Sequence, residues 1–286
     1  MMNNTTGSYP FDTLRKEQRH QELNRLERKA AFFSELEKEK WVQAGLKSGM
    51  KALDLGCGAG FTSCEIAKIT YPGTVIGVDF SEAMLEKAME VKKSKGITNL
   101  NLELVNVYQL NFPDNYFDFI HARFFFQHLT NPIVAINNIY RVLKPGGIFC
   151  VFDVDNDWFT IYPKPESLTK LAQKISAIQQ AQGGDGYVGR KLWSYFKKAG
   201  FSKIETQVEV ITSDKFGLKT ILNLLSFGSP YYSQYQDLAI FAERAKKDTY
   251  SLIDVADAWA GFGIFMVTGC KPNAVLIPNP VKIEPF

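Results

Sequence analysis

The residues most able to do chemistry lie in one glycine-rich stretch, Leu53–Phe61, which reads L-D-L-G-C-G-A-G-F. A short apolar run leads into it, and glycine occupies the alternate positions Gly56, Gly58 and Gly60. Glycine is favoured where the backbone takes a positive φ or lets a ligand approach closely. A strand that ends in such a turn and opens a helix forms a nucleotide-type pocket at the carboxyl edge of a parallel sheet. The stretch therefore predicts a pocket for a nucleotide or a nucleoside.

The spacing of the glycines indicates which ligand this pocket takes. The dinucleotide fingerprint is G-x-G-x-x-G, in which the third small residue lets the helix pack closely on the strand. Here that third position falls on Phe61, and the glycines run G-x-G-x-G instead. The stretch also lacks the Gly-Lys-Ser/Thr of a P-loop and any Lys or Arg that could face a pyrophosphate. We expect a nucleoside without phosphates, and an NAD-dependent oxidoreductase is a disfavoured alternative.

Four further motifs follow the glycine stretch in order along the chain. The first is a strand with an acidic end at Val75–Leu85, and the second, Leu110–Arg123, leads into and along a later strand. The other two are F-Q-H-L at Phe126–Leu129 and R-V-L-K-P-G-G at Arg141–Gly147. With Leu53–Gly60, these motifs resemble those of the class I S-adenosylmethionine-dependent methyltransferases, in particular the small-molecule group that includes the quinone C-methyltransferases. The resemblance covers roughly residues 45–155, with weaker similarity to about 213 and again near 263–272.

Two aspartates are candidates for polar contacts with this cofactor. Asp79 ends a hydrophobic strand about 20 residues beyond the glycine turn, where an acid is expected to bind ribose hydroxyls. The alternative is a helix cap, because Ser81 and Glu82 follow it. The resemblance places Asp54 near the amino-acid half of the cofactor, where a carboxylate suits an ammonium group. The alternative for Asp54 is a structural carboxylate that holds the glycine turn.

Further cofactor contacts follow from the resemblance. It places Met84 on the adenine face, and a thioether packs favourably on an aromatic ring. Asn106 stands where members of the family often have Asp, and its amide can accept from the adenine amine and donate to a ring nitrogen. Arg123 closes the fourth strand beside the cofactor, with a salt bridge inside the fold as the alternative. The predicted cofactor-binding residues are Asp54, Gly56, Gly58, Asp79, Phe80, Met84, Asn106, Val107 and Arg123.

Catalysis of methyl transfer from a sulfonium needs little machinery, because the methyl group is already activated. The enzyme mainly holds the accepting atom, the methyl group and the sulfur in line. A base is needed only where the accepting atom carries a proton with a high pKa. His128 is the candidate base, since a histidine pKa lies near neutrality. F-Q-H-L resembles a signature shared by family members with very different substrates, so an architectural role for His128 is the alternative.

Acidic residues follow the fifth expected strand. Asp153, Asp155 and Asp157 alternate, and on an extended segment they point to the same side. Alternating carboxylates can hold Mg²⁺, but strand-end loops are often acidic and Arg123 stands where a companion acid would be needed. We therefore expect no metal, and we expect Asp153 to contact the substrate.

Aromatic residues indicate the type of acceptor. Trp158 and Tyr162 follow the acids, and a later insertion carries Phe216, Phe227, Tyr231, Tyr232 and Tyr235. Aromatic residues at this density usually build core, but over a pocket they form an apolar wall with hydroxyl groups. We expect Trp158 and Tyr162 to contact a small, apolar or aromatic acceptor.

The order of apolar and polar residues predicts the elements that position these residues. Residues 12–45 carry apolar side chains at helical spacing, and from 50 to 155 short apolar runs alternate with helical stretches, as in a parallel βαβ sheet. We expect a Rossmann-like, doubly wound α/β fold. The resemblance implies a mostly parallel seven-stranded sheet with an antiparallel last strand. We expect an N-terminal helical lid segment at 1–40, a catalytic domain at 41–272 with helical lid insertions at about 156–186 and 214–258, and an irregular tail at 273–286.

Composition is typical of a globular enzyme. The chain has 286 residues, of which 45% are hydrophobic and 22% charged. A net charge of +3 is too small for a nucleic-acid interface, and the chain lacks an apolar run of about 18 residues that would span a membrane. The four cysteines lack zinc-site spacing, and with a polar start at residues 1–8 they favour a cytoplasmic location.

These features together predict transfer of a methyl group from S-adenosylmethionine to a small, apolar or aromatic acceptor by in-line displacement. The partner is then a small-molecule methyl acceptor, with no nucleic acid and no membrane span. A non-catalytic regulator or assembly partner that binds S-adenosylmethionine is the main alternative, ahead of the oxidoreductase. The sequence leaves open the identity of the acceptor, the choice among O-, N-, C- and S-methylation, and the oligomeric state.

Overall fold

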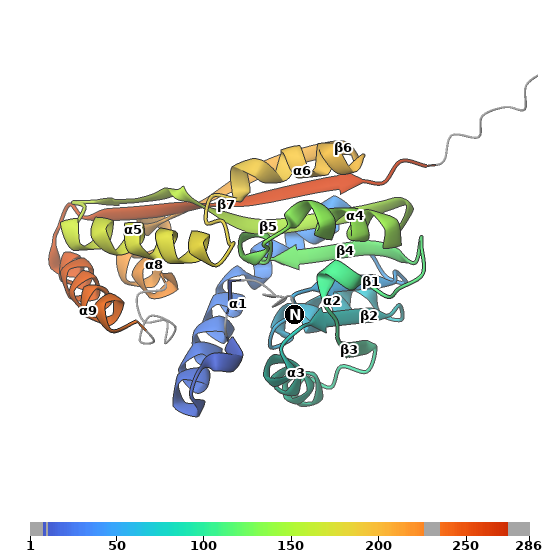
Figure 1. Cartoon of the computed structure of the whole chain (residues 1–286), viewed down its shortest axis with the longest axis horizontal. Coiled ribbons are helices and arrows are strands. Elements are labelled where there is room, and N and C mark those ends of the chain that lie inside the picture. Colours follow the sequence, from blue (N-terminus) through green and yellow to red (C-terminus); the bar gives the residue numbers. More distant parts are fainter. Residues whose placement is uncertain (1–7, 10, 226–234, 274–286) are drawn as a thin grey trace, which may run out of the picture.

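A seven-stranded mixed sheet forms the centre of the computed structural model, which describes residues 8–9, 11–225 and 235–273 (Figure 1). The strands lie in the order β3-β2-β1-β4-β5-β7-β6. Neighbours from β3 to β5 are parallel, whereas β7 is antiparallel to both β5 and β6. This confirms the predicted Rossmann-like α/β fold and its antiparallel last strand. The strands are β1 Ala52–Leu55, β2 Val75–Asp79, β3 Leu100–Leu104, β4 Phe117–Arg123, β5 Leu143–Tyr162, β6 Ser202–Thr212 and β7 Trp259–Cys270.

Helices cover both faces of the sheet. In the described part of the chain they are α1 Lys16–Ala44, α2 Phe61–Thr70, α3 Glu82–Ser94, α4 Pro132–Val142, α5 Glu166–Ala181, α6 Leu192–Ala199, α7 Ser213–Phe216, α8 Leu218–Leu224 and α9 Gln236–Tyr250. Single 3₁₀ turns lie at η1 Phe11–Thr13, η2 Val107–Gln109, η3 Phe126–His128, η4 Gly189–Lys191 and η6 Ser251–Asp254. None of the described helices has the length and apolar character needed to cross a bilayer.

The central strands are buried on both faces, which explains why they read as nearly continuous apolar runs. On β1, Ala52 packs into a core shared with α1 and α2, whereas Leu53 and Leu55 pack into a second core shared with α4 and α6. Strand order reverses between β1 and β4, because β2 and β3 lie on one side of β1 and β5 lies beyond β4. Ligands of such sheets bind at this switch point, outside the carboxyl ends of the strands.

Strands β5 and β7 extend well beyond the parallel part of the sheet. Their pairing continues to Tyr162 opposite Trp259, after a shift in register between Val154 and Phe159. Helices α5, α8 and α9 lie at this extended end (Figure 1). Residues 156–162, which we expected in a helical insertion, therefore continue β5, and the helix begins only at Glu166.

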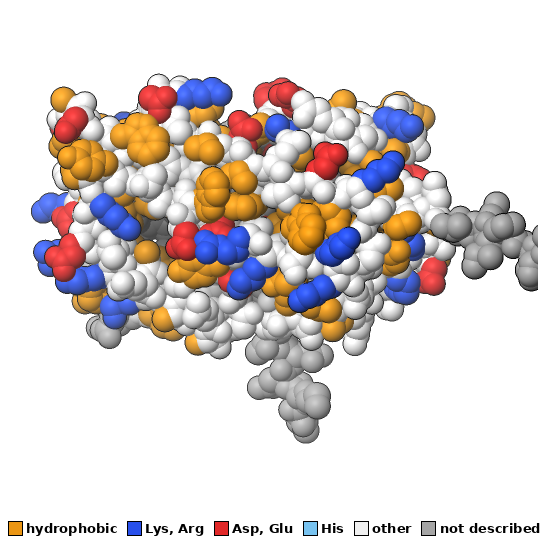
Figure 2. Space-filling model, turned by 90° about the horizontal axis from the view of Figure 1, so that it is seen from above, with side chains coloured by type: hydrophobic (Ala, Val, Ile, Leu, Met, Phe, Trp, Pro, Cys, Tyr) orange, Lys and Arg blue, Asp and Glu red, His pale blue; other side chains and the backbone are white. Residues whose placement is uncertain are grey.

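Some predicted segments fall partly outside the described residues. The N-terminal lid segment is described at 8–9 and from 11 onward, where α1 runs to Ala44. The predicted tail is described only at Asn273, and Phe227, Tyr231 and Tyr232 also lie outside the described residues. On the face seen in Figure 2, basic side chains are interspersed with acidic and apolar ones, and the described residues form no continuous stripe of one charge there.

Candidate active site

A cavity of about 690 Å³ opens at the carboxyl ends of β1, β2 and β4 and reaches α5 and α8. Its first part contains the glycine turn, Asp79, Met84 and Asn106. Its second part has an apolar wall formed by Leu168, Leu171, Ala172, Ile175, Leu224, Leu225, Phe262 and Ile264. A cavity of this size is typical of small-molecule sites, which occupy about 300–1,000 Å³.

The glycine turn brings bare backbone to the cavity wall. Gly56 and Gly58 have φ values of 63° and 52°, in the left-handed region that other residues avoid. A Cβ at Gly56 would overlap the ring of Phe125, whereas a Cβ at Gly58 would meet nothing within 4 Å. Gly56 is therefore required by both backbone and space, and Gly58 leaves an open approach for a ligand.

Asp79 lies beside this turn and holds it. Its carboxylate accepts hydrogen bonds from the backbone N–H of Gly58 at 2.9 Å and of Ser81 at 3.0 Å, one at each oxygen. The cap of α3 is Ser81, whose hydroxyl accepts from the N–H of Met84 at 3.2 Å. Burial raises the pKa of Asp79. Each carboxylate oxygen keeps a further lone pair, so the geometry fits an acceptor of ribose hydroxyls.

Asp54 is held by the fold. It is buried, with 2% of its surface exposed, and it accepts from the Ser63 hydroxyl at 2.5 Å. Its other oxygen lies 2.9 Å from Nδ1 of the buried His121. These bonds join β1 to α2 and β4. The contacts of Asp54 are therefore those of a structural carboxylate that holds the glycine turn, although the residue also borders the cavity.

The predicted adenine residues lie together at the first part of the cavity. Met84 and Val107 are buried and line it, and Phe80 lines it with an exposed ring. The side-chain oxygen of Asn106 accepts from the N–H of Tyr108 at 2.9 Å and thereby caps η2. The amide N–H groups of Asn106 have no partner among the described residues, so they suit a ring nitrogen acceptor.

Arg123 lines the cavity but is bound within the fold. Its Nε lies 3.0 Å from the Glu37 carboxylate, and its Nη1 donates to the Thr62 hydroxyl at 2.9 Å. Its guanidinium carbon lies 5.1 Å from the centre of the Phe124 ring. Arg123 therefore forms a salt bridge with Glu37 inside the fold, which is the alternative to a contact with the cofactor.

Comparison with known proteins identifies the family. A family model described as a methyltransferase domain matches residues 46–215. The chain belongs to the methyltransferase domain family. S-adenosylmethionine is the cofactor of the class I members that the sequence resembles, and this prediction is confirmed at the level of the family.

Relatives and solved structures agree with this membership. An uncharacterized methyltransferase of Schizosaccharomyces pombe is 35% identical over 154 residues, covering 51% of this chain and 55% of the relative, so the chain spans about half of that protein. Demethylmenaquinone methyltransferase of Staphylococcus saprophyticus is 30% identical over 178 residues, covering 58% of this chain and 76% of the relative. Phosphoethanolamine N-methyltransferase 2 of Haemonchus contortus, solved with S-adenosyl-L-methionine, shares the fold with a TM-score of 0.54 and 21% identity, covering 79% of this chain and 50% of that chain.

The structure does not bring the predicted substrate residues of this methyltransferase domain to its cavity. Asp153 is fully buried, accepts from the N–H of Gln127 at 3.2 Å, and is absent from the cavity wall. Trp158 packs edge-on against Phe265, and Tyr162 is 63% exposed to solvent. Trp158 and Tyr162 were expected in a lid over the pocket, but both lie on β5, which continues to Tyr162.

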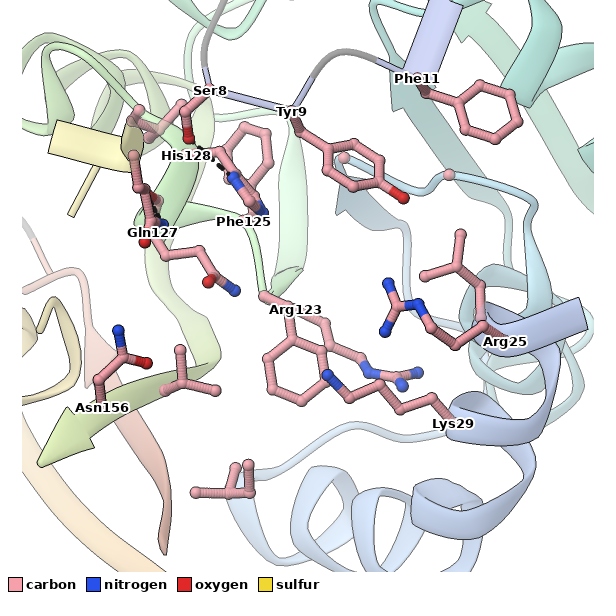
Figure 3. A pocket seen from close by; sticks show the side chains of 18 of the residues that line it. Ser8, Tyr9, Phe11, Arg25, Lys29, Arg123, Phe125, Gln127, His128 and Asn156 are labelled. Atoms are coloured by element: carbon pink, nitrogen blue, oxygen red, sulfur yellow. Dashed lines mark hydrogen bonds between the residues drawn. The ribbon is translucent and has the colours of Figure 1, made fainter. Parts of the chain in front are cut away.

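His128 borders the cavity of the methyltransferase domain beside the N-terminal segment (Figure 3). Its Nδ1 lies 2.9 Å from the Ser8 hydroxyl, and its ring centroid lies 5.2 Å from that of Tyr9. Burial, and then the charges of Lys29 and Arg25, lower the pKa of His128 to about 4. A neutral histidine with this pKa is a weak base at neutral pH, so its contacts suit an architectural role.

Several cavity residues were missed from the sequence. Arg25 and Lys29 project from α1, Gln127 from η3 and Asn156 from β5 (Figure 3). Arg25 and Lys29 are four residues apart and so share one helix face, which was the available signal. The sequence of α1 does not show that this face meets the cavity, because charged residues occur all around the helix.

Proposed function

We propose that this protein transfers the methyl group of S-adenosylmethionine to a small, largely apolar or aromatic acceptor by in-line displacement. The observation that carries the proposal is the continuity of the cavity. One space of about 690 Å³ joins the glycine turn and Asp79 to the apolar wall of α5, α8 and β7. A site for the donor alone would not need this second part.

The donor end is assigned to residues whose free groups match a nucleoside. Asp79 would accept from the ribose hydroxyls, Met84 would pack on the adenine, and Asn106 would donate to its ring. The backbone at Gly58 would allow close approach of the donor. When bound, S-adenosylmethionine supplies a methyl group on a positively charged sulfur, which is a good leaving group.

The acceptor end is assigned to the apolar wall. Leu171, Ile175 and Phe262 would exclude water and hold an apolar body, while Gln127 and Asn156 would orient a polar group. Holding the reactants in line can lower the barrier by about 7–11 kcal/mol. The name of the demethylmenaquinone methyltransferase relative supports an acceptor with a ring and an apolar chain.

Two measurements test the proposal. Calorimetry should detect binding of S-adenosylhomocysteine and no binding of NAD. Incubation with S-adenosylmethionine labelled in the methyl group should then transfer label to a member of a panel of apolar phenols and quinols, including reduced demethylmenaquinone. If the product binds but no acceptor in the panel is labelled, the non-catalytic regulator becomes the better hypothesis. If S-adenosylhomocysteine does not bind, the donor assignment is wrong.

A pair of variants on α5 tests the acceptor end. Ala172 and Ala177 lie on the same helix and both are exposed, but only Ala172 lines the cavity. Ala172→Phe should fill the apolar part, reduce turnover at least about tenfold and leave S-adenosylhomocysteine affinity unchanged. Ala177→Phe is the matched control and should behave like the unmodified protein. Equal turnover by both variants would place the acceptor elsewhere.

A further inference from the structure

Lys29 lines the cavity and forms no salt bridge with any of the described residues. Of the four lysines and arginines that line the cavity in the described residues, Arg25 and Arg123 have carboxylate partners and Lys164 is exposed to solvent. Lys29 is half-buried, and among the described residues its ammonium group interacts with the ring of Phe124, whose centre lies 4.3 Å from Nζ. A half-buried ammonium without a carboxylate is costly, and a cation–π contact offsets only part of that cost.

The neighbouring arginine is fixed by its own partners. Glu22 receives two hydrogen bonds from Arg25, at 2.9 Å and 2.6 Å, and a third at 2.6 Å from the Tyr9 hydroxyl. These bonds occupy Glu22, which is fully buried and does not line the cavity. Asp153 is bound to backbone N–H groups. The nearby acids are therefore engaged elsewhere, and Lys29 faces the cavity from α1 (Figure 3).

We propose that Lys29 binds an anionic oxygen of the methyl acceptor, so that the acceptor is amphipathic. Its acidic head, a carboxylate or an ionised phenol or enol, lies at Lys29. Its apolar body lies against the wall formed by α5, α8 and β7. This inference rests on the proposed function, because it assigns the second part of the cavity to the acceptor.

The charges around Lys29 predict that binding of an anion there is coupled to uptake of a proton. Burial, and then the charges of Arg25 and Arg123, lower the pKa of Lys29 to about 7, against the opposing effects of Glu22 and Asp153. His128, with a pKa of about 4, is neutral at pH 7 to 8. An anion beside Lys29 raises its pKa, so binding at pH 8 takes up as much as about 0.9 proton per site. The buffer supplies this proton, and calorimetry in two buffers of different ionisation enthalpy measures it.

The test compares two probes of equal length on protein saturated with S-adenosylhomocysteine. Octanoate carries an anionic head and 1-octanol a neutral one. Octanoate should bind the unmodified protein at least about tenfold more tightly, with proton uptake at pH 8. Lys29→Met should lose both the preference and the uptake. Lys174→Met is the matched control, because Lys174 also lies over a phenylalanine ring, at 4.7 Å from Phe241, but does not line the cavity.

Each result decides the inference. Loss of the preference in Lys29→Met alone, with unchanged affinity for S-adenosylhomocysteine, supports it and shows that the variant is folded. An equal preference in all three proteins overturns it, and so does the absence of binding by both probes. Weaker binding of S-adenosylhomocysteine with an unchanged probe preference assigns Lys29 to the donor carboxylate and also overturns it. Failure of the unmodified protein to bind S-adenosylhomocysteine is a different result, which removes the proposed function itself.

Discussion

Replacement of Asp79 by alanine tests the donor site most directly. The Asp79 carboxylate has two functions in the structure, because it accepts from the N–H groups of Gly58 and Ser81 and also faces the cavity. Asp79→Ala therefore removes the proposed acceptor of the ribose hydroxyls. It also leaves two backbone N–H groups of the glycine turn without their protein partner.

The size of each effect follows from these bonds. Hydrogen bonds to a charged group contribute about 1.5–3 kcal/mol, which corresponds to about 10–150-fold in affinity for S-adenosylhomocysteine. Of the two residues whose N–H groups are released, Gly58 is half-buried and Ser81 is buried. Loss of these two hydrogen bonds should lower the free energy of unfolding by about 1–3 kcal/mol in total. We expect both changes, with the loss of affinity exceeding what a partly unfolded population explains.

Calorimetric titration with S-adenosylhomocysteine and urea unfolding separate these effects. Asp118→Ala is the control, because Asp118 also accepts from a backbone N–H, that of Lys51 at 2.9 Å, and does not line the cavity. This control should lose stability and keep its affinity. An unchanged dissociation constant in Asp79→Ala would refute the assignment of Asp79 to the donor.

Three further predictions concern the turn, the candidate base and the acid stability. Gly56→Ala must adopt a positive φ and displace the ring of Phe125, so it should lower the free energy of unfolding by about 2–5 kcal/mol, against about 1–2 kcal/mol for Gly58→Ala, as measured by urea unfolding. His128→Asn should lower kcat less than tenfold, with no limb near pH 6.5 in the rate profile; a loss of 10²-fold or more would restore the role of a base. Burial alone would raise the pKa of Glu65, but three lysine ammonium groups lower it to about 2. Its folded pKa lies below its unfolded pKa, so its contribution is complete above about pH 4.3 and is lost towards about pH 2. Because the three lysines are partly exposed and solvent screens them, Glu65→Gln should remove about 1–2 kcal/mol at pH 7 and flatten this acid limb, and equal unfolding curves at pH 7 would contradict the reasoning.

The donor end could be predicted from the sequence because its residues are close along the chain. The glycine turn, Asp79 and Met84 lie within one βαβα unit, and strand alternation fixes which side chains reach the carboxyl edge. Local patterns were sufficient for these elements, since each is determined mainly by its own residues and nearest neighbours. The seven-stranded sheet and its antiparallel β7 were expected only from the resemblance to the family, because the pairing of β7 with β5 and β6 is not written in a local pattern.

The acceptor end could not be predicted in the same way. The segment from Asp153 to Tyr162 contains acids and aromatics that are typical of a loop, yet it pairs with β7 about a hundred residues later. This pairing places Trp158 and Tyr162 in β5, and neither residue lines the cavity. Lys29 was missed for a related reason, because the contacts of α1 with the rest of the fold, and not its own pattern, decide which of its faces meets the cavity.

The contacts of Asp54 explain why the glycine turn is held more rigidly than the apolar wall of the cavity. Its carboxylate is buried between Ser63 and His121 and ties the glycine turn to α2 and β4. Removing one partner of such a buried network leaves unpaired polar groups that cost about 1–3 kcal/mol each. The donor turn is thus held rigidly by neighbouring strands and helices. The proposed acceptor wall is formed by β7, α5, α8 and the far end of β5, and only the first half of β5 pairs with the strand β4 that carries His121. We therefore expect substitutions on that wall to change the choice of acceptor while the proposed donor site keeps its geometry.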